Sequence, residues 1–325
     1  MNKHIRVVFL SIAATVLATP TAGFTQAYPA KPIRMVTQFA AGSGGDALTR
    51  VAATYLSTTM HQPVVIENRA GAGGVQAAEA IARAAPDGYT IGALTPGVVV
   101  VRVVAGTPFS IDPNKDLVPL TAVGQTGSLI VANAAAPVNS LRELIDYARK
   151  YPGKLSYATS GIGSPHHMAA EEIQLLTGTQ MVHVPYKAGA QAMTDVITGV
   201  IPIGFMIVSE VAPQVKAGKI KLLASREAHR LRQFPSLPAV AEIIPGFEPM
   251  PGWTGLFAPV GIPAAIFSRL NSDILRTLKL PEVEEKINQA GFEVIANTPE
   301  QFAAQIKSEQ ALVAKVAKAA NIKLE

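Results

Sequence analysis

Three short stretches rich in glycine and hydroxyl side chains lead from apolar runs into helical patterns, at residues 42–46, 160–164 and 186–189. The first backbone N–H groups of a helix have no partner within the helix, and the helix dipole adds positive potential there. Small residues let a ligand approach these groups closely. Each stretch could therefore hold a carboxylate, a phosphate or a sulfate. Taken alone, each stretch is more often a turn that serves folding only.

The three stretches would form one site if they lay at the carboxyl ends of strands facing a common cleft, which is where ligands bind to open α/β sheets. A two-domain arrangement could then hold both ends of an elongated anion. The hydroxyl groups of Ser43, Thr159, Ser160 and Ser164 would add contacts beside the backbone donors. Such a site needs few cationic side chains, because backbone N–H groups supply the positive potential.

Other ligand-binding and catalytic motifs find little support. The first stretch lacks the Lys-Ser/Thr ending of a P-loop, and Gly42, Gly44 and Gly45 do not have the G-x-G-x-x-G spacing of a dinucleotide-binding fold. No serine lies in a G-x-S-x-G elbow. The chain has no cysteine, which excludes disulfides, thiolate metal sites and a cysteine nucleophile. We therefore expect neither a cofactor nor a metal.

Histidines are the remaining candidates for chemistry. His166 and His167 are adjacent, so on a helix their side chains diverge by about 100°, and they match no zinc-protease pattern. We favour a role in capping the first helical turn or in contacting a ligand. His183 lies between two valines of a predicted strand, which is typical of a structural histidine. An exported hydrolase of a carboxylic or phosphate ester, with His167 or His183 as base and a nearby serine as nucleophile, remains an alternative.

The N-terminal residues 1–27 have the features of a signal peptide. Lys3 and Arg6 precede an apolar run that is shorter than a membrane span, and residues 25–27 offer a cleavage site of small residues. We therefore expect a periplasmic mature chain that begins near residue 28 and does not insert into a membrane. The formal charge of +5 over 325 residues includes no run of more than two Lys or Arg, which argues against a nucleic-acid partner.

Alternating strand and helix patterns must position the three stretches, and they predict an α/β fold with mostly parallel sheets. Apolar runs predict strands over residues 33–39, 64–67, 89–94, 155–159 and 182–184. Residues 90–106 form the most apolar later window, but Pro96 and Arg102 interrupt it, which favours buried strands over a membrane span.

Capping signals mark several helix starts. Asp46 is expected to cap the helix that follows the first stretch. Ser164, followed by Pro165, is expected to cap the helix after the second. A further helix is predicted to follow the third stretch and to end near Gly199. Two capping boxes precede other helical patterns, and they are Ser140 with Glu143 and Thr298 with Gln301.

Two glycine-containing stretches, residues 123–127 and 251–255, could be crossings between two domains. Trp253, the only tryptophan, would then either pack at the hinge or form an aromatic wall of the cleft. We expect the protein to be a monomer. If both crossings are hinges, the chain has an inserted second domain and a discontinuous first domain, at residues 126–253 and at residues 28–125 with 254–325.

Seven segments follow one another along nearly the whole mature chain: YPAKPIRMVTQFAAGSGGD, ENRAGAGG, APDGYTIG, LSYATSGIGSPHHMAAE, HVPYKAGAQAMTDVITG, VKAGKIKLLA and WTGLFAPVGIP. Together they resemble the Bug-type solute receptors of tripartite tricarboxylate transporters. The resemblance implies a non-catalytic periplasmic binding protein of type II, with two α/β domains and a ligand cleft between them. Receptors of this family typically bind small carboxylates through backbone amides, small side chains and ordered waters. The resemblance also implies a membrane permease as partner.

Position by position, the resemblance implies ligand contacts from both domains. The first domain would contribute Ala41, Gly42, Ser43 and Asp46. The second domain would contribute Ser160, Gly161, Gly163, Ser164 and His167, with Tyr186 and Lys187 nearby.

Some positions depart from the family's usual residues. Met206 stands where many members carry an aspartate, and Pro202 replaces a frequent acidic residue. We therefore expect one polar contact to be lost and the bound molecule to present an apolar or aromatic surface there. Ser43, Gly45 and Ala188 also differ from the usual family residues.

The sequence thus predicts a receptor that captures a small carboxylate, such as a dicarboxylate or an aromatic carboxylate, by domain closure and offers it to a permease. An orphan periplasmic sensor that binds the same ligand would share all of these sequence features. Transport and sensing therefore stay open as alternatives at this level.

Overall fold

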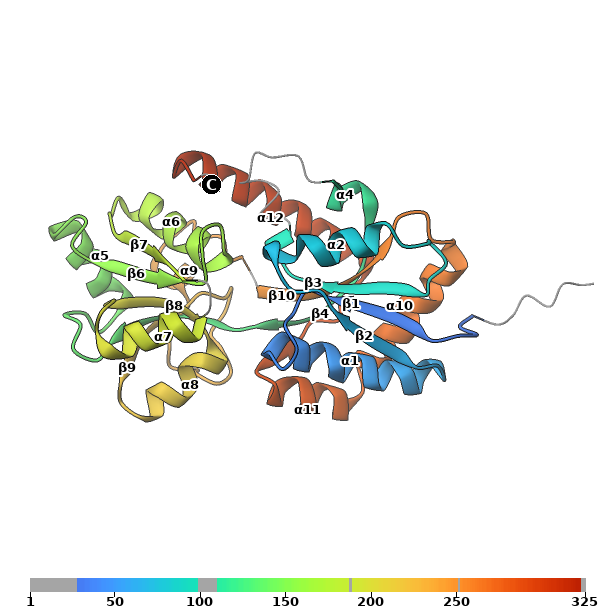
Figure 1. Cartoon of the computed structure of the whole chain (residues 1–325). Coiled ribbons are helices and arrows are strands. Elements are labelled where there is room, and N and C mark those ends of the chain that lie inside the picture. The colour runs from blue at the N-terminus through green and yellow to red at the C-terminus, as the bar shows by residue number, and fades with distance from the viewer. Residues whose placement is uncertain (1–27, 99–109, 187–188, 251, 323–325) are drawn as a thin grey trace, which may run out of the picture.

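The computed structural model describes residues 28–98, 110–186, 189–250 and 252–322 (Figure 1). The expected signal peptide, the ligand candidate Lys187 and residues 99–106 of the apolar window lie outside these ranges. Within the described ranges the chain forms two β-sheets, each packed between helices. None of the described helices combines the length and the hydropathy that a bilayer span requires.

The larger sheet has six strands in the described part of the chain, in the order β11-β4-β10-β3-β1-β2. Strand β1 pairs in parallel with β2 and β3, whereas β10 and β11 run antiparallel to their neighbours. The strands are β1 (Ile33–Thr37), β2 (Val64–Asn68), β3 (Thr90–Leu94), β4 (Leu117–Thr126), β10 (Gly252–Pro259) and β11 (Phe292–Val294).

The smaller sheet has five strands among the described residues, in the order β7-β6-β8-β5-β9. Strand β6 pairs in parallel with β7 and β8, whereas β5 is antiparallel to β8 and β9. The strands are β5 (Ser128–Asn133), β6 (Ser156–Thr159), β7 (Val182–Pro185), β8 (Ile203–Ile207) and β9 (Ile220–Ser225).

The predicted α/β fold is confirmed, but the expectation of mostly parallel sheets is wrong for the strands near the crossings. Strands β4 and β5 are separated by Gly127 alone, so the chain passes directly from the larger sheet into the smaller one. It returns along β10, which lies beside β4 and runs against it. A chain that leaves and re-enters a sheet at the same end must run antiparallel to itself there.

Helices cover both faces of the larger sheet because successive strand residues point to opposite faces. Met35 of β1 joins the core under α1, α10 and α11, whereas its neighbour Val36 joins the core under α2 and the first part of α12. These helices are α1 (Gly44–Met60), α2 (Val75–Ala82), α10 (Ala264–Leu278), α11 (Pro281–Gln289) and α12 (Pro299–Ala319).

The smaller sheet is covered in the same way. Ile130 of β5 packs under α5, α6 and α9, and its neighbour Leu129 packs under α7 and α8. These helices are α5 (Leu141–Lys150), α6 (Pro165–Thr177), α7 (Gly189–Thr198), α8 (Val208–Lys216) and α9 (Val240–Ile243). Two short elements, η1 (Ala72–Gly74) and α4 (Pro113–Asp116), lie in loops of the larger sheet.

Most predicted helix caps are confirmed. The side chains of Ser140, Ser164 and Thr298 each accept a hydrogen bond from a backbone N–H three residues later. Asp46 is not the cap of α1, because the helix already begins at Gly44. Ser43 is the N-cap, and its hydroxyl accepts the N–H of Asp46 at 3.3 Å.

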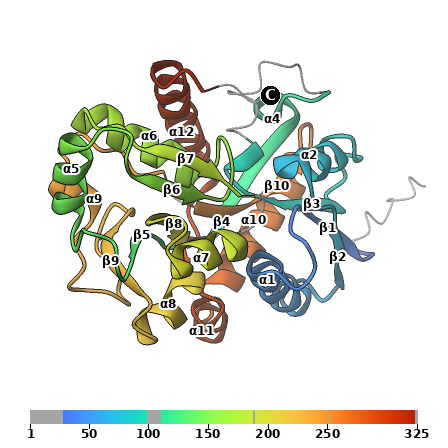
Figure 2. The same ribbon diagram turned by 60° about the vertical axis from the view of Figure 1, so that its left-hand side comes forward.

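Helix α12 extends from the larger sheet to helix α6, which covers the smaller sheet (Figures 1 and 2). Its first half packs on the larger sheet through Phe302 and Ile306. Its second half packs against α6 through Val313 and Val316, in a cluster that also contains Met168. The C-terminal helix is therefore a third connection between the two halves of the molecule, beside the two strand crossings.

Trp253 lies at the β10 crossing and is 1% exposed. Its indole Nε1–H donates to the Glu309 carboxylate of α12 at 2.7 Å, and its ring packs edge-on against Phe302. Burial raises the pKa of Glu309 to about 7. Of the two roles considered for Trp253, the structure supports packing at the crossing and not a wall of the cleft.

Candidate ligand-binding site

The first two glycine-rich stretches each follow a strand of a parallel pair. Strand β1 ends at Thr37 before the loop into α1, and β6 ends at Thr159 before the loop into α6. Figure 1 shows the starts of α1 and α2 on the side of the larger sheet that is turned toward the smaller sheet. These two helix starts therefore point toward the other half of the molecule.

The second and third stretches lie against each other. A Cβ atom on Gly161 would be 3.5 Å from the carbonyl oxygen of Tyr186, and the Tyr186 N–H donates to the Thr159 carbonyl at 3.0 Å. The first stretch belongs to the other sheet. Among the residues that the structure describes, no hydrogen bond or ion pair joins it to the other two.

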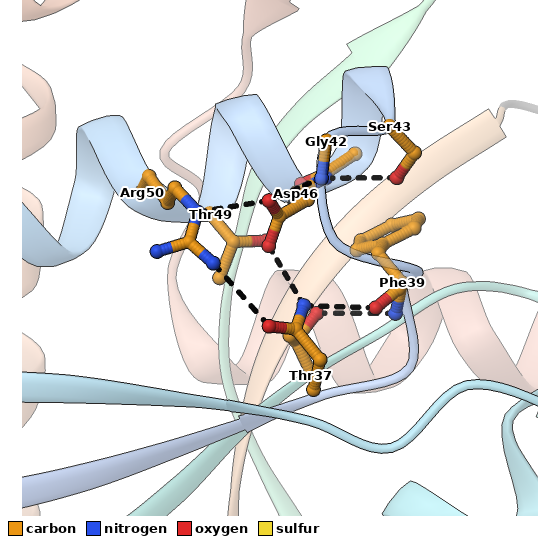
Figure 3. Close-up of polar contacts among 9 residues, drawn as sticks. Thr37, Phe39, Gly42, Ser43, Asp46, Thr49 and Arg50 are labelled. Atoms are coloured by element: carbon orange, nitrogen blue, oxygen red, sulfur yellow. Dashed lines mark hydrogen bonds and ion pairs between the residues drawn. The ribbon is translucent and has the colours of Figure 1, made fainter.

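Asp46 braces the first loop from below (Figure 3). Asp46 is 2% exposed, and its carboxylate accepts the N–H of Gly42 at 2.9 Å, Arg50 Nε at 2.8 Å and Asn68 Nδ2 at 2.7 Å. Burial opposes ionisation, but the bonds from Arg50, Asn68 and Gly42 outweigh it and lower the pKa of Asp46. Asp46 therefore holds the loop as an anion and has little surface for a ligand.

The donors of the first loop lie just beyond this brace. Gly42 has a φ of 82°, which turns the chain toward the helix, and Ala41, Gly42 and Gly44 are exposed. The N–H groups of the exposed Gly44 and the buried Gly45 have no partner within the described part of the chain. The half-buried hydroxyl of Ser43 lies beside them. These groups can bind one carboxylate.

The second loop is organised around two of its own N–H groups. The Gly161 N–H donates to Thr159 Oγ1 at 3.2 Å, and the buried Gly163 N–H donates to His167 Nδ1 at 3.0 Å. Ser164 caps α6, and the exposed Ser160 hydroxyl contacts His166 Nδ1 at 3.1 Å. Neither glycine N–H is therefore free for a ligand.

Two other donors of the second loop differ in exposure, since Ile162 is exposed and His166 is buried. In the described ranges, the N–H groups of Ile162 and His166 have no partner. The Ile162 side chain is 43% exposed at the tip of the loop. Sequence reasoning missed Ile162 because an isoleucine in a loop carries no ligand signal of its own. The glycines on either side of Ile162 were the available signal in the sequence, because they mark a loop whose tip carries this one large side chain.

Three histidines beneath the second loop are neutral. Burial, followed by the nearby Arg226 charge, lowers the pKa of His166 to about 3. Burial lowers the pKa of His167 to about 4, and burial together with the adjacent His167 lowers that of His183 to about 3. His167, expected at the ligand, is 5% exposed and supports the loop from below.

The third loop differs from the other two because a protein carboxylate already lies at its helix start. Glu210 of α8 occupies the space that a Cβ atom on Gly189 would take, at the first residue of α7. Burial raises the pKa of Glu210. Glu210 was missed by sequence reasoning, since its approach to α7 depends on how two helices pack.

Two further predicted contacts are also engaged with the protein. The Tyr186 hydroxyl donates to Asp195 at 2.5 Å, and burial with this bond raises the pKa of Tyr186 to about 12. Met206 is 1% exposed and packs with Val196 and Val208 in the core beneath α7 and α8. In this arrangement the Met206 side chain is part of the core.

A cavity of about 450 Å³ lies between elements of the two sheets. Phe292 of β11 lines it and also lies 3.9 Å from the position of a Cβ on Gly44, so the cavity adjoins the first loop. Its other walls include Gly127, Val208, His229, Arg232, Glu284 and Asn288. The described residues contain no cluster of His, Asp and Glu arranged for a metal ion.

Solved structures of similar shape define the class of this fold. The structure of Rpa4515 from R. palustris with adipate has a TM-score of 0.79 and 31% identity, covering 91% of this chain and 99% of that one. The structure of the periplasmic binding protein BugD has a TM-score of 0.76 and 30% identity, covering 92% and 100% of the two chains. The fold is that of periplasmic solute-binding proteins.

Sequence comparisons place the chain within one group of these proteins. The family model described as tripartite tricarboxylate transporter family receptor matches residues 48–322. The protein BugT of Bordetella pertussis is 33% identical over 313 residues, which cover 95% of this chain and 94% of BugT. The chain belongs to the tripartite tricarboxylate transporter receptor family. Its family and fold are those of solute-binding receptors.

Proposed function

We propose that this receptor captures a small dicarboxylate between its two halves and delivers it to a tripartite membrane permease. The observation that carries the proposal is the pair of helix starts, α1 on one sheet and α6 on the other. Each offers, beside a serine hydroxyl, N–H groups that have no partner among the described residues, at Gly44 and Gly45 and at Ile162 and His166. Two separate anion sites suit a molecule with two carboxylates.

Two other groups, a carboxylate at the start of α7 and an exposed apolar side chain in the second loop, narrow the class of ligand. The start of α7 is occupied by Glu210, so a third ligand carboxylate has no equivalent site there. The exposed Ile162 side chain offers apolar contact to the chain between the carboxylates. Adipate, which is bound in the Rpa4515 structure, has this form: an aliphatic chain with a carboxylate at each end.

We further propose that binding closes two domains, formed by residues 28–125 with 254–325 and by residues 126–253. The sheet topology supports these bounds, because β5 to β9 lie together in one sheet and all other strands in the second. Helix α12 packs on both, so closure must shift one half of this helix against its neighbours. Ligand binding is then expected to change the fluorescence of Trp253, whose bond to Glu309 lies at the crossing.

The proposed setting is the periplasm, reached through the N-terminal segment, with the receptor acting as a monomer. Family membership supports delivery to a permease, and the permease would recognise the closed form. Capture of permease subunits by the ligand-loaded receptor would support transport. Capture of a signalling protein instead would favour a sensor.

Thermal unfolding of residues 28–325 with a ligand panel tests the proposal. The panel contains aliphatic dicarboxylates of increasing length, aromatic carboxylates, citrate, hexanoate, phosphate and nucleotides. A ligand at 100 times its dissociation constant stabilises the native state by about 2.7 kcal/mol. We expect dicarboxylates to raise the melting temperature and hexanoate to raise it much less. Stabilisation by phosphate or nucleotides alone would contradict the proposal. In a separate incubation, hydrolysis of a carboxylic or phosphate ester by the receptor would indicate the hydrolase.

A further inference from the structure

The two histidines behind the second loop form a stacked pair. The rings of His167 from α6 and His183 from β7 have centroids 3.8 Å apart and planes within 10° of parallel. Tyr157 of β6 also stacks on His183, with ring centroids 5.0 Å apart. Three consecutive rings thus lie under the loop that leads from β6 to α6.

Each imidazole of the pair is tied to one glycine N–H of the loop. His167 Nδ1 accepts the Gly163 N–H directly at 3.0 Å. His183 Nε2 lies 2.7 Å from Thr159 Oγ1, which in turn accepts the Gly161 N–H at 3.2 Å. These bonds turn both glycine N–H groups toward the protein, on either side of Ile162.

We propose that His167 and His183 are positioning residues that set the second loop for anion binding and act only as neutral rings. The inference rests on the proposed function, because it assigns the pair to the loop that would hold a ligand carboxylate. His167 accepts the Gly163 N–H directly, and His183 contacts the Thr159 hydroxyl that accepts the Gly161 N–H. Together they fix the loop, and the Ile162 N–H has no partner among the described residues and is left for a ligand. Neither histidine touches the ligand.

The requirement for neutral rings follows from the hydrogen bond. Nδ1 of His167 must carry no proton, because it accepts a backbone N–H. A proton on Nδ1 would place two donors against each other. Protonation of both rings would also place two positive charges at stacking distance. The groups that face the pair are Glu171 of α6, whose Oε1 is 3.7 Å from His167 Nε2, and Tyr157, which donates to Glu171. Burial keeps the pKa of both rings far below 6.5, at about 4 and about 3.

Substitutions of His167 separate its role as a hydrogen-bond acceptor from its role in the ring stack. His167→Phe keeps an aromatic ring but removes the acceptor, so a buried N–H is left unpaired. We expect it to weaken adipate binding about tenfold or more. His167→Asn places an oxygen near the Nδ1 position and should recover part of the affinity. Tyr157→Phe removes the bond to Glu171 in the same core without touching a loop N–H, and should bind adipate as the parent does.

NMR of the unliganded receptor tests the inference apart from any ligand. At neutral pH, ¹⁵N spectra should show His167 with an unprotonated Nδ1 and a protonated Nε2. Amide exchange at Gly163 should be faster in His167→Phe than in the parent and in His167→Asn. A protonated Nδ1, or unchanged Gly163 exchange with unchanged adipate affinity in His167→Phe, overturns the inference. If the parent binds no carboxylate, the proposed function fails, while the NMR results still decide the role of the histidines.

Discussion

The loops at the starts of α1 and α6 are alike in backbone but are held by opposite kinds of group. In the first loop the charged carboxylate of Asp46, paired with Arg50, accepts the Gly42 N–H. In the second loop the neutral ring of His167 accepts the Gly163 N–H. In both, an acceptor below the loop takes a glycine N–H, while neighbouring N–H groups have no partner among the described residues. Each loop therefore needs an acceptor below it, and the charge of that acceptor decides how the loop responds to pH.

Valine at the braced glycines should have the largest effect on both loops. Gly42 and Gly163 have φ values of 82° and 72°, which a β-branched residue adopts only with strain. We expect Gly42→Val and Gly163→Val each to abolish dicarboxylate binding in calorimetry, with a loss of stability of about 1–2 kcal/mol.

Gly153→Val is the matched control for Gly42→Val. Gly153 also has a positive φ, 70°, and at both positions a Cβ would meet no atom within 4 Å. The control should lose similar stability and bind normally. Normal binding by Gly42→Val would remove the first loop from the site.

Removal of the charged brace should be the next largest effect. Asp46→Ala leaves the Gly42 N–H without its acceptor and removes the bonds from Arg50 and Asn68. We expect a loss of about 2–4 kcal/mol in urea unfolding together with weaker binding. Asp46→Asn keeps one acceptor oxygen and should lose less.

Asp273 of α10 offers a control for Asp46. It is also buried, at 3% exposure, and accepts bonds from Arg269 and Arg276 far from either loop. Asp273→Ala should lose stability without losing affinity per folded molecule. Equal losses of affinity in both variants would show that Asp46 acts only through global stability.

Acid should loosen the two loops in different pH ranges. The pKa of His167 is lowered to about 4, so its contribution to stability is complete above 6.5 and declines as the pH falls toward 4. The pKa of Asp46 is below 3.8, so its contribution is lost only at lower pH. We expect the exchange protection of the Gly163 amide to fall before that of Gly42 when the unliganded protein is acidified from pH 7. Loss of protection at the Gly163 and Gly42 amides over the same pH range would contradict this difference between the two loops.

The third loop allows the smallest but most specific test. Glu210→Gln removes the charge at the start of α7 while keeping the side-chain volume. The N–H groups at the start of α7 then face a neutral side chain. Citrate, with three carboxylates, should therefore gain affinity by a few fold relative to adipate. Titration calorimetry of both ligands gives the ratio. An unchanged ratio would mean that α7 does not face the bound ligand.

Local signals predicted much of the fold. Ser140, Ser164 and Thr298 cap helices as their spacing indicated, because capping depends on residues within one turn. The shift of the α1 cap from Asp46 to Ser43 shows the limit of this reasoning, since both residue types make good caps. The antiparallel return of β10 beside β4 could not be predicted, because pairing of distant strands leaves no local pattern.

The site was predictable in its loops but less so in the roles of its side chains. The glycines and serines mark both helix starts, since their small size is needed at the position itself. Asp46 and His167 were expected at the ligand, whereas the structure places them behind the loops. Glu210 approaches α7 from another helix, and the His167 and His183 rings come from different elements. Such contacts depend on tertiary packing.

The central claim is that one ligand spans the starts of α1 and α6. A crystal structure of the receptor with adipate, or with whichever dicarboxylate stabilises it most, tests this directly. We predict one carboxylate within hydrogen-bonding distance of the Gly44 and Gly45 N–H groups and the other at the Ile162 and His166 N–H groups. A ligand bound at only one of these helix starts, or in the cavity lined by Phe292 and Arg232, would contradict the claim.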